Sequence, residues 1–243
     1  LCEAGIVPEI VITNPDRPAG RKKVLTPPQT KIIAERYRSI VFQPESISAH
    51  ALLEKAPDIA FGVVAAYGHI IPPEVFNAFP RGIIGVHPSL LPQYRGASPI
   101  QSAILEGEKE TGVTLYLIDE KVDHGAMLIQ KRRAINPHDT FETLLLKLAE
   151  DSAELLIQLL PRFMQKEIKG KEQAHTLATF TKKFKTEDGY IDATQLHDAE
   201  INGGSEAILI ERKIRALNPE PGVYTLRDGK RIKLLGARLS ENK

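Results

Sequence analysis

Strand-like and helix-like segments alternate along the first two thirds of this chain, and this alternation restricts the possible folds more than any other feature. Short runs of β-branched residues are each followed by an amphipathic run, up to about residue 165. Such alternation is typical of strands joined by helical crossovers. We therefore expect an α/β fold with a doubly wound, mostly parallel, Rossmann-like sheet.

The individual elements follow from composition and from capping residues. The expected strands lie at 6–13, 40–42, 59–66, 82–86, 111–117 and 126–132. The expected helices lie at 30–38, 48–55, 72–78, 98–106 and 140–163. The chain opens with what reads as the last turn of a helix, stopped by Gly5. We therefore expect the first strand and helix of the sheet to be missing, and the open edge to favour aggregation.

The pattern changes after residue 165, which we take as the end of the larger domain, residues 1–165. A polar, lysine-rich stretch follows, and we expect a linker over 166–204. Beyond it the sequence predicts one helix and two strands, at 205–217, 222–227 and 231–239. Because a lone hairpin is marginal in water, residues 205–243 are expected to begin a small β domain of which the rest is absent.

Composition excludes several classes of protein. The net charge is +1, which argues against a wholesale polyelectrolyte binder. The single cysteine, Cys2, allows no internal disulfide and fits a reducing, cytoplasmic location. No apolar run approaches the ~20 residues that span a bilayer, so no membrane partner is expected.

The candidate chemistry gathers where two expected strands end. His87 directly follows the strand 82–86, at the carboxyl edge where α/β sheets bind ligands, and an imidazole is a suitable general base. A loop rich in acids follows the strand 111–117 and contains Asp119 and Asp123. A carboxylate beside an imidazole orients it and raises its pKa. Spacing alone does not decide between the two aspartates, although we favour Asp123.

Other chemistries are disfavoured by what the sequence lacks. Ser89 does not stand in the Gly-x-Ser-x-Gly elbow of serine hydrolases. The seven histidines show no zinc-like spacing, and neither a Walker nor a dinucleotide glycine pattern occurs. We therefore expect no metal, ATP or NAD.

Two motifs resemble the folate-dependent formyltransferase superfamily. The first runs over 87–100 and reads His-Pro-Ser-Leu-Leu-Pro-Gln-Tyr-Arg-Gly-Ala-Ser-Pro-Ile; the second is Val122-Asp123-His124-Gly125. Three further stretches, 14–21, 184–192 and 214–222, narrow the resemblance to the methionyl-tRNA formyltransferases. That family begins with another βα unit and continues into an OB-like barrel, which agrees with truncation at both ends.

The resemblance implies transfer of a formyl group from 10-formyltetrahydrofolate to the amine of methionyl initiator tRNA, in translation initiation. The family's catalytic histidine and aspartate match His87 and Asp123, and we expect a monomer. The residues implied in the folate pocket are Ala66, Tyr67, Gly68, Ser89, Leu90, Leu91, Pro92, Ile118 and Val122.

Position 85 departs from the family's pattern. The family has an asparagine two residues before the histidine, and its amide helps to hold the formyl oxygen, whereas this chain has Gly85. Losing one such donor costs on the order of 10²–10³ in rate. We therefore expect activity to be impaired, and Gly85→Asn to raise it.

Basic residues in the loop 14–29 point to RNA. The resemblance implies that this loop meets the acceptor end of the tRNA, through Arg17, Arg21, Lys22 and Lys23. The segment 209–243 is also basic, since it contains nine Lys and Arg residues and four Asp and Glu residues, a net charge of +5.

Three alternatives stay open. A formyltransferase that acts on a sugar amine or on glycinamide ribonucleotide would share His87 and Asp123 without needing the basic loop. A non-catalytic folate- or RNA-binding remnant would fit Gly85 and the truncated ends. Folate-linked hydrolysis of the formyl group is the weakest of the three.

Overall fold

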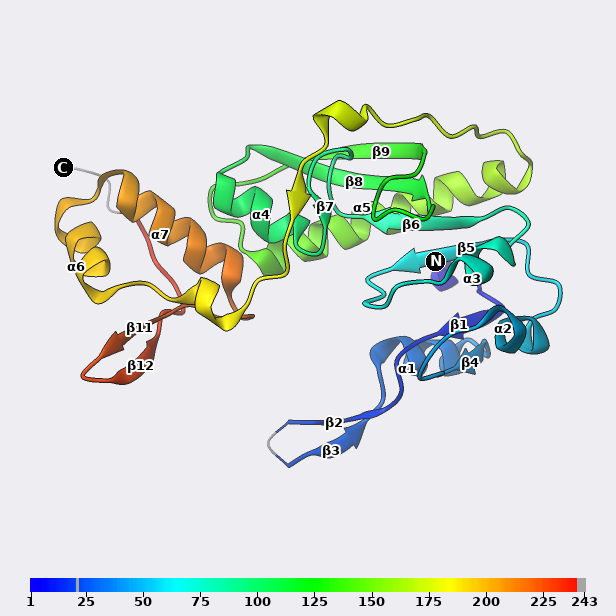
Figure 1. The fold of residues 1–243 in the computed structure, drawn as a ribbon, viewed down its shortest axis with the longest axis horizontal. Coiled ribbons are helices and arrows are strands. Elements are labelled where there is room, and N and C mark those ends of the chain that lie inside the picture. Colours follow the sequence, from blue (N-terminus) through cyan, green and yellow to red (C-terminus); the bar gives the residue numbers. More distant parts are fainter. Residues whose placement is uncertain (21, 240–243) are drawn as a thin grey trace.

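The architecture was obtained as a computed structural model, which describes residues 1–20 and 22–239 (Figure 1). A four-stranded sheet forms the centre of the larger part. Its strands, in spatial order, are β5 (Gly62–Ala65), β6 (Ile83–His87), β8 (Glu110–Leu117) and β9 (Met127–Ala134).

The directions of these strands correct one expectation. β5 and β6 are parallel, but β6 pairs with β8, and β8 with β9, in antiparallel fashion. The prediction of a mostly parallel sheet is therefore wrong for this sheet. Residues 118–126, which join β8 to β9, form no helix, and a crossover between parallel strands needs about a dozen residues or more. The chain consequently turns back on itself there.

A second, smaller sheet accompanies the first. β1 (Ile10–Ile12) and β4 (Ile40–Phe42) pair in parallel, as the alternation predicts. No ladder of hydrogen bonds joins this pair to β5 within residues 1–20 and 22–239. β5 is therefore an edge strand of the four-stranded sheet, and its Val63 is 36% exposed.

The helices of the larger part lie close to their expected positions. They are α1 (Gln29–Arg36), α2 (Ala49–Lys55), α3 (Pro73–Asn77), α4 (Pro99–Glu106) and α5 (Phe141–Met164). Hydroxyl caps begin two of them: Ser48 accepts the amide hydrogen of Ala51, and Thr140 accepts that of Thr143. The confirmed helices show that local capping and periodicity agree with the fold.

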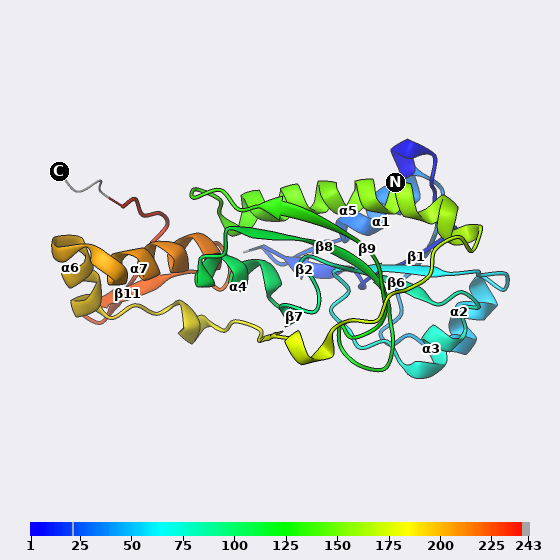
Figure 2. The same cartoon turned by 90° about the horizontal axis from the view of Figure 1, so that it is seen from above.

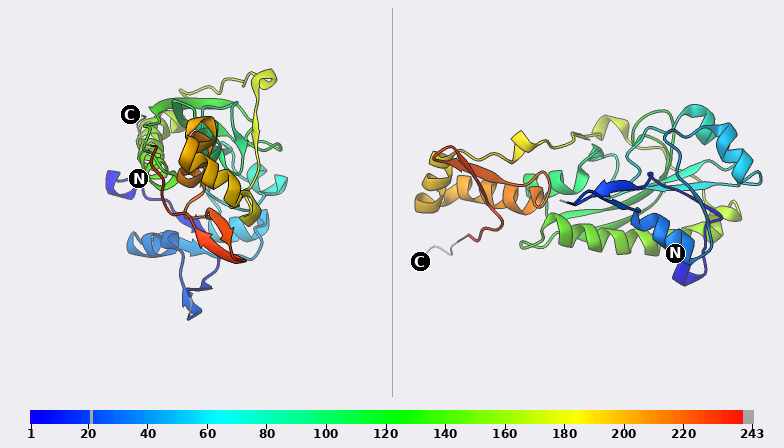
Figure 3. Two further views of the ribbon diagram at one scale, coloured as in Figure 1. Left: turned by 90° about the vertical axis from the view of Figure 1, so that its left-hand side faces the viewer. Right: turned by 90° about the horizontal axis from the view of Figure 1, so that it is seen from below.

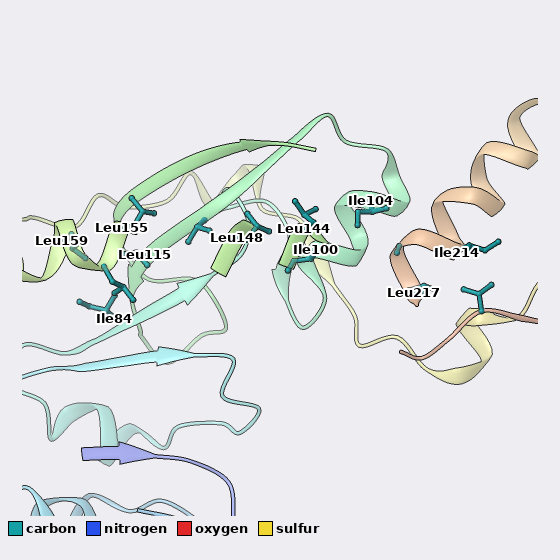
Figure 4. Close-up of a cluster of buried hydrophobic side chains, with 14 of the residues drawn as sticks. Ile84, Ile100, Ile104, Leu115, Leu144, Leu148, Leu155, Leu159, Ile214 and Leu217 are labelled. Carbon is teal, nitrogen blue, oxygen red and sulfur yellow. The ribbon is translucent and has the colours of Figure 1, made fainter. Parts of the chain in front are cut away.

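One face of the sheet is buried under α5, which runs along it (Figure 2). Leu144, Leu148, Leu155 and Leu159 repeat at helical spacing and lie in one cluster with Leu115 and Ile84 (Figure 4). Because side chains alternate along a strand, residues neighbouring Leu115 in β8 point to the opposite face. That second face carries the candidate site.

The segment expected as a linker contains regular structure. β10 (Phe180–Thr181) pairs with β7 (Arg95–Gly96), and α6 (Ala193–Asn202) precedes α7 (Gly204–Leu217). α7 packs against α4, and Ile214 and Leu217 of α7 are buried in the same cluster as Ile104 of α4 (Figure 4). The expected hairpin follows as β11 (Tyr224–Arg227) and β12 (Lys230–Lys233), while the domain boundaries themselves stay predictions.

A second hairpin, absent from the expected elements, projects from the larger part (Figure 3). Its strands are β2 (Arg17–Ala19) and β3 (Val24–Thr26), which pair in antiparallel fashion and are exposed throughout. Within the described ranges no helix has both the length and the apolar composition to cross a bilayer.

Candidate active site

His87 is the last residue of β6 and is 5% exposed. Its Nε2 lies 2.8 Å from the backbone oxygen of Tyr94. Because a carbonyl oxygen only accepts hydrogen bonds, Nε2 must carry the hydrogen, and Nδ1 is the nitrogen that can accept a proton. Nδ1 lies 3.5 Å from Oδ2 of Asp123. A proton taken up at Nδ1 would therefore produce an imidazolium beside a carboxylate.

Burial lowers the pKa of His87 below its ordinary value of 6.5, although the charge of Asp123 and the Tyr94 carbonyl act in the opposite direction. The imidazole is consequently neutral near pH 7. A neutral imidazole with a free lone pair is the form that a general base requires.

Asp123 reaches His87 by a route that the sequence did not indicate. Since β8 runs antiparallel to β6, its end lies beside the beginning of β6, where the amide of Ile118 donates to the oxygen of Ile83 at 2.9 Å. The loop after β8 then returns across the open face of the sheet to His87. The structure thus brings His87 and Asp123 together, but not because their strands end at one edge.

Three hydrogen bonds hold Asp123 in place. Oδ2 accepts the backbone N–H of Gly96 at 2.7 Å, and Oδ1 accepts the hydroxyl of Tyr116 at 2.7 Å. Its backbone oxygen accepts from Nε2 of Gln173 at 3.0 Å. Its φ of 50° lies in the left-handed region, which a non-glycine residue adopts only where its surroundings enforce it. Both carboxylate oxygens are therefore directed rather than free to rotate.

The other candidate carboxylate belongs to a different pair. Oδ2 of Asp119 lies 2.7 Å from Nδ1 of His124, whose ring stacks on that of His175 with a centroid distance of 4.1 Å. The tertiary structure therefore separates two aspartates that spacing left equivalent: Asp123 faces His87, and Asp119 faces His124.

The side chain of Tyr116, from the neighbouring strand, fills the space beside Gly85. Gly85 and Tyr116 stand directly opposite each other in the β6–β8 register, so the tyrosine ring lies over the glycine. A Cβ atom at position 85 would lie 2.4 Å from Cε1 of Tyr116 and 2.8 Å from its hydroxyl oxygen. Burial, and then the charge of Asp123, raise the pKa of Tyr116 far above its ordinary value, so the phenol stays protonated and donates.

After Tyr116, Gln173 is the second residue of the site that the sequence analysis missed. It is 4% exposed and comes from the stretch expected as a linker. Nε2 donates to the backbone oxygens of Asp123 and Gly125, while Oε1 accepts from Nε and Nη2 of Arg95. A single glutamine in a polar stretch gives no local signal for such a role. Tyr116 does have a signal in the sequence, because side chains alternate along 111–117 and place it on the same face as Thr114.

The residues implied in the folate pocket lie in three places. Those at 66–68 follow β5 and those at 89–92 follow β6, and the two parallel strands end at the same edge. Ser89 is fully buried, and its hydroxyl donates to the oxygen of Gln93 at 2.6 Å, so it shapes the turn. Ile118 lies beside the opposite end of β6, where its amide donates to the oxygen of Ile83. Val122, in the loop after β8, is 69% exposed.

The basic residues lie on the projecting hairpin. Arg17 in β2 and Lys22 and Lys23 in the turn are exposed, while Arg21 lies outside the described residues. The base of the hairpin is held by an ion pair between Asp16 and Lys31 at 2.8 Å. The structure therefore places three of the four residues predicted to contact RNA on one exposed hairpin.

Comparisons with known proteins agree with this architecture. Residues 4–160 match the family model described as formyl transferase, and residues 185–243 match the formyl transferase C-terminal domain. Methionyl-tRNA formyltransferase from Chloroflexus aurantiacus is 41% identical over 232 residues, which cover 95% of this chain and 72% of that protein. The enzyme of the same name from Kosmotoga olearia is 41% identical over 236 residues, with 96% and 72% covered.

Two solved structures share the fold at lower identity. A 4-N formyltransferase from Francisella tularensis superposes with a TM-score of 0.67 at 21% identity, over 88% of this chain and 84% of that one. A sugar N-formyltransferase from Shewanella sp. gives a TM-score of 0.66 at 23% identity, over 87% and 81%. At these identities the likeness concerns the fold alone.

Proposed function

Because this chain belongs to the methionyl-tRNA formyltransferase family, we propose that it transfers the formyl group of 10-formyltetrahydrofolate to the amino group of methionyl initiator tRNA. The observation that carries the proposal at the level of the site is the approach of His87 Nδ1 to the Asp123 carboxylate, at 3.5 Å. Both side chains lie on the sheet face that α5 leaves open.

The chemistry requires one proton to leave the attacking nitrogen. The neutral amine attacks the formyl carbon, which becomes tetrahedral and places negative charge on its oxygen. Nδ1 of His87 accepts the proton that the nitrogen loses, and Asp123 stabilises the resulting imidazolium. The bond between the formyl carbon and N10 of the folate then breaks. N10 takes up a proton, and the products are tetrahydrofolate and formyl-methionyl-tRNA.

The geometry suits this sequence of steps. Burial keeps the imidazole neutral before reaction, and the held carboxylate favours its charged form once the proton arrives. The turn 89–92 and the segment 66–68 are proposed to contact the folate, together with Ile118 and Val122. The support is the family match and the shared edge of β5 and β6.

The projecting hairpin is proposed to contact the tRNA. Arg17, Lys22 and Lys23 are exposed there, and lysine and arginine contact phosphate in protein–RNA interfaces. Arg21 joins them by the family match alone. Each lost phosphate contact lowers the salt dependence of binding.

The test is a competition among acceptors in full-length protein, read by mass spectrometry. With 10-formyltetrahydrofolate as donor, we expect formylation of methionyl-tRNA and not of an amino-sugar nucleotide or of glycinamide ribonucleotide. Preference for either small acceptor overturns the assignment, and hydrolysis of the donor without an acceptor favours a hydrolase. His87→Asn is expected to abolish transfer without preventing folding.

A matched pair of variants separates chemistry from tRNA binding. Replacing Lys22 and Lys23 by serine is expected to raise KM for methionyl-tRNA and to leave KM for the folate unchanged. Replacing Lys166 and Lys169, which are exposed beyond the end of α5 and lie outside both basic segments, by serine controls for a general loss of positive charge. Equal effects of the two double variants would contradict a specific role for the projecting hairpin.

A further inference from the structure

Gly85 and Tyr116 form a structural pair. The register sets them opposite each other, and the ring of Tyr116 fills the space in which any side chain at position 85 would begin. The pair is well buried, since Tyr116 is only 7% exposed. A residue without a side chain is therefore a requirement of this site, because it admits the ring.

The ring brings a polar group close to position 85. The hydroxyl oxygen of Tyr116 lies 2.8 Å from the Cβ position of residue 85. The phenol thus brings a donor close to position 85, and its single hydrogen is used in the bond to Oδ1 of Asp123.

This donor acts on Asp123. The Tyr116 hydroxyl donates to Oδ1 at 2.7 Å, and the Gly96 amide donates to Oδ2, the oxygen that faces His87 at 3.5 Å. Without the phenol, Oδ1 would have no partner in the structure described here, and the carboxylate would turn toward water to satisfy it. The direction of the carboxylate relative to the imidazole therefore depends on Tyr116.

We infer that Tyr116 is a positioning residue for the formyl transfer: through its hydrogen bond it holds the Asp123 carboxylate against His87, and Gly85 exists to admit its ring. This inference rests on the proposed function for its catalytic meaning. The expectation that the formyl oxygen lacks the family's amide donor stays a prediction, because the one hydrogen of the Tyr116 hydroxyl is donated to Asp123.

Tyr116→Phe tests the inference, because it keeps the ring over Gly85 and removes only the hydroxyl. We expect kcat to fall about tenfold to a hundredfold, the effect of one hydrogen bond to a charged group, with little change in either KM. The control is Tyr190→Phe, which also removes a phenol bonded to an aspartate, Asp192 at 3.3 Å, on the C-terminal part. The control is expected to leave kcat unchanged, and an unchanged kcat in Tyr116→Phe overturns the inference.

A second measurement does not depend on turnover. In the wild type the Asp123 charge opposes the effect of burial on His87. When the carboxylate is released by Tyr116→Phe, the pKa of His87, followed by NMR of the labelled imidazole, is expected to fall. An unchanged or higher pKa overturns the positioning role even if kcat has dropped. If the wild type transfers no formyl group, the proposed function is wrong, whereas the titration of His87 still tests whether Tyr116 positions Asp123.

A swap of the two residues gives an independent test that tolerates a folding defect in Tyr116→Phe. Gly85→Asn alone is expected to lower activity, since its Cβ meets the tyrosine ring. Adding Tyr116→Leu removes the obstruction and is expected to restore the free energy of unfolding toward the wild-type value, while turnover stays low because the hydroxyl that holds Asp123 is absent. Higher turnover in Gly85→Asn alone, as the family pattern suggested, would overturn the pairing.

Discussion

The smallest possible side chain at position 85 should destabilise the protein. Gly85→Ala places a Cβ 2.4 Å from Cε1 and 2.5 Å from Cζ of Tyr116, whereas carbon atoms in ordinary contact lie about 3.5–4.0 Å apart. The ring must withdraw by roughly 1 Å or more. It has little freedom to do so, because the ring is buried and its hydroxyl is bonded to Asp123.

The magnitude follows from two routes that lead to a similar value. Overpacking of a well-ordered core costs about 1–3 kcal/mol. If the ring instead moves and loses its bond to the carboxylate, the loss is about 1.5–3 kcal/mol. We therefore expect Gly85→Ala to lower the free energy of unfolding by about 2 kcal/mol.

Urea unfolding followed by far-UV circular dichroism measures this loss; the chain contains no tryptophan, which excludes the usual fluorescence assay. Gly236→Ala is the matched control, since a Cβ there meets nothing within 4 Å. A double-mutant cycle with Tyr116→Leu should show that the alanine costs much less once the ring is gone. A Gly85→Ala protein as stable as the wild type, or a cycle without coupling, would refute the reasoning.

Three further predictions concern the surrounding network. Burial lowers the pKa of His87, so the unfolded chain binds a proton at this residue more readily than the folded chain does. Stability is therefore lost as the pH falls through about 6.5. In a plot of unfolding free energy against pH, His87→Gln should reduce the slope in this range. Gln173→Glu removes both donors to the loop of Asp123 and should cost about 1–3 kcal/mol in thermal or urea unfolding, with faster amide exchange in that loop. Asp151 is fully buried and paired with Arg133, so Asp151→Asn should lower the free energy of unfolding by about 2 kcal/mol in urea unfolding. The hydrogen bond from Arg133 lowers the pKa of Asp151, so the stabilisation from this pair should be lost as the pH drops below about 4.

Local sequence determined most of the elements and the identity of the candidate base. Capping hydroxyls and apolar periodicity act within one turn of a helix, which explains why the helices at 49–55 and 141–164 begin beside Ser48 and Thr140. His87 was expected where the apolar strand ends, because the strand pattern stops there. The motifs at 87–100 and 122–125 carried the family resemblance, which the comparisons confirmed.

The tertiary structure decided which groups meet. Asp119 and Asp123 are equivalent by spacing, but the returning loop sets only Asp123 against His87. The antiparallel direction of β8 depends on pairing between segments far apart in the chain, and no local pattern encodes its register against β6. That register alone places Tyr116 over Gly85, so the meaning of a missing side chain could not be read from position 85 itself.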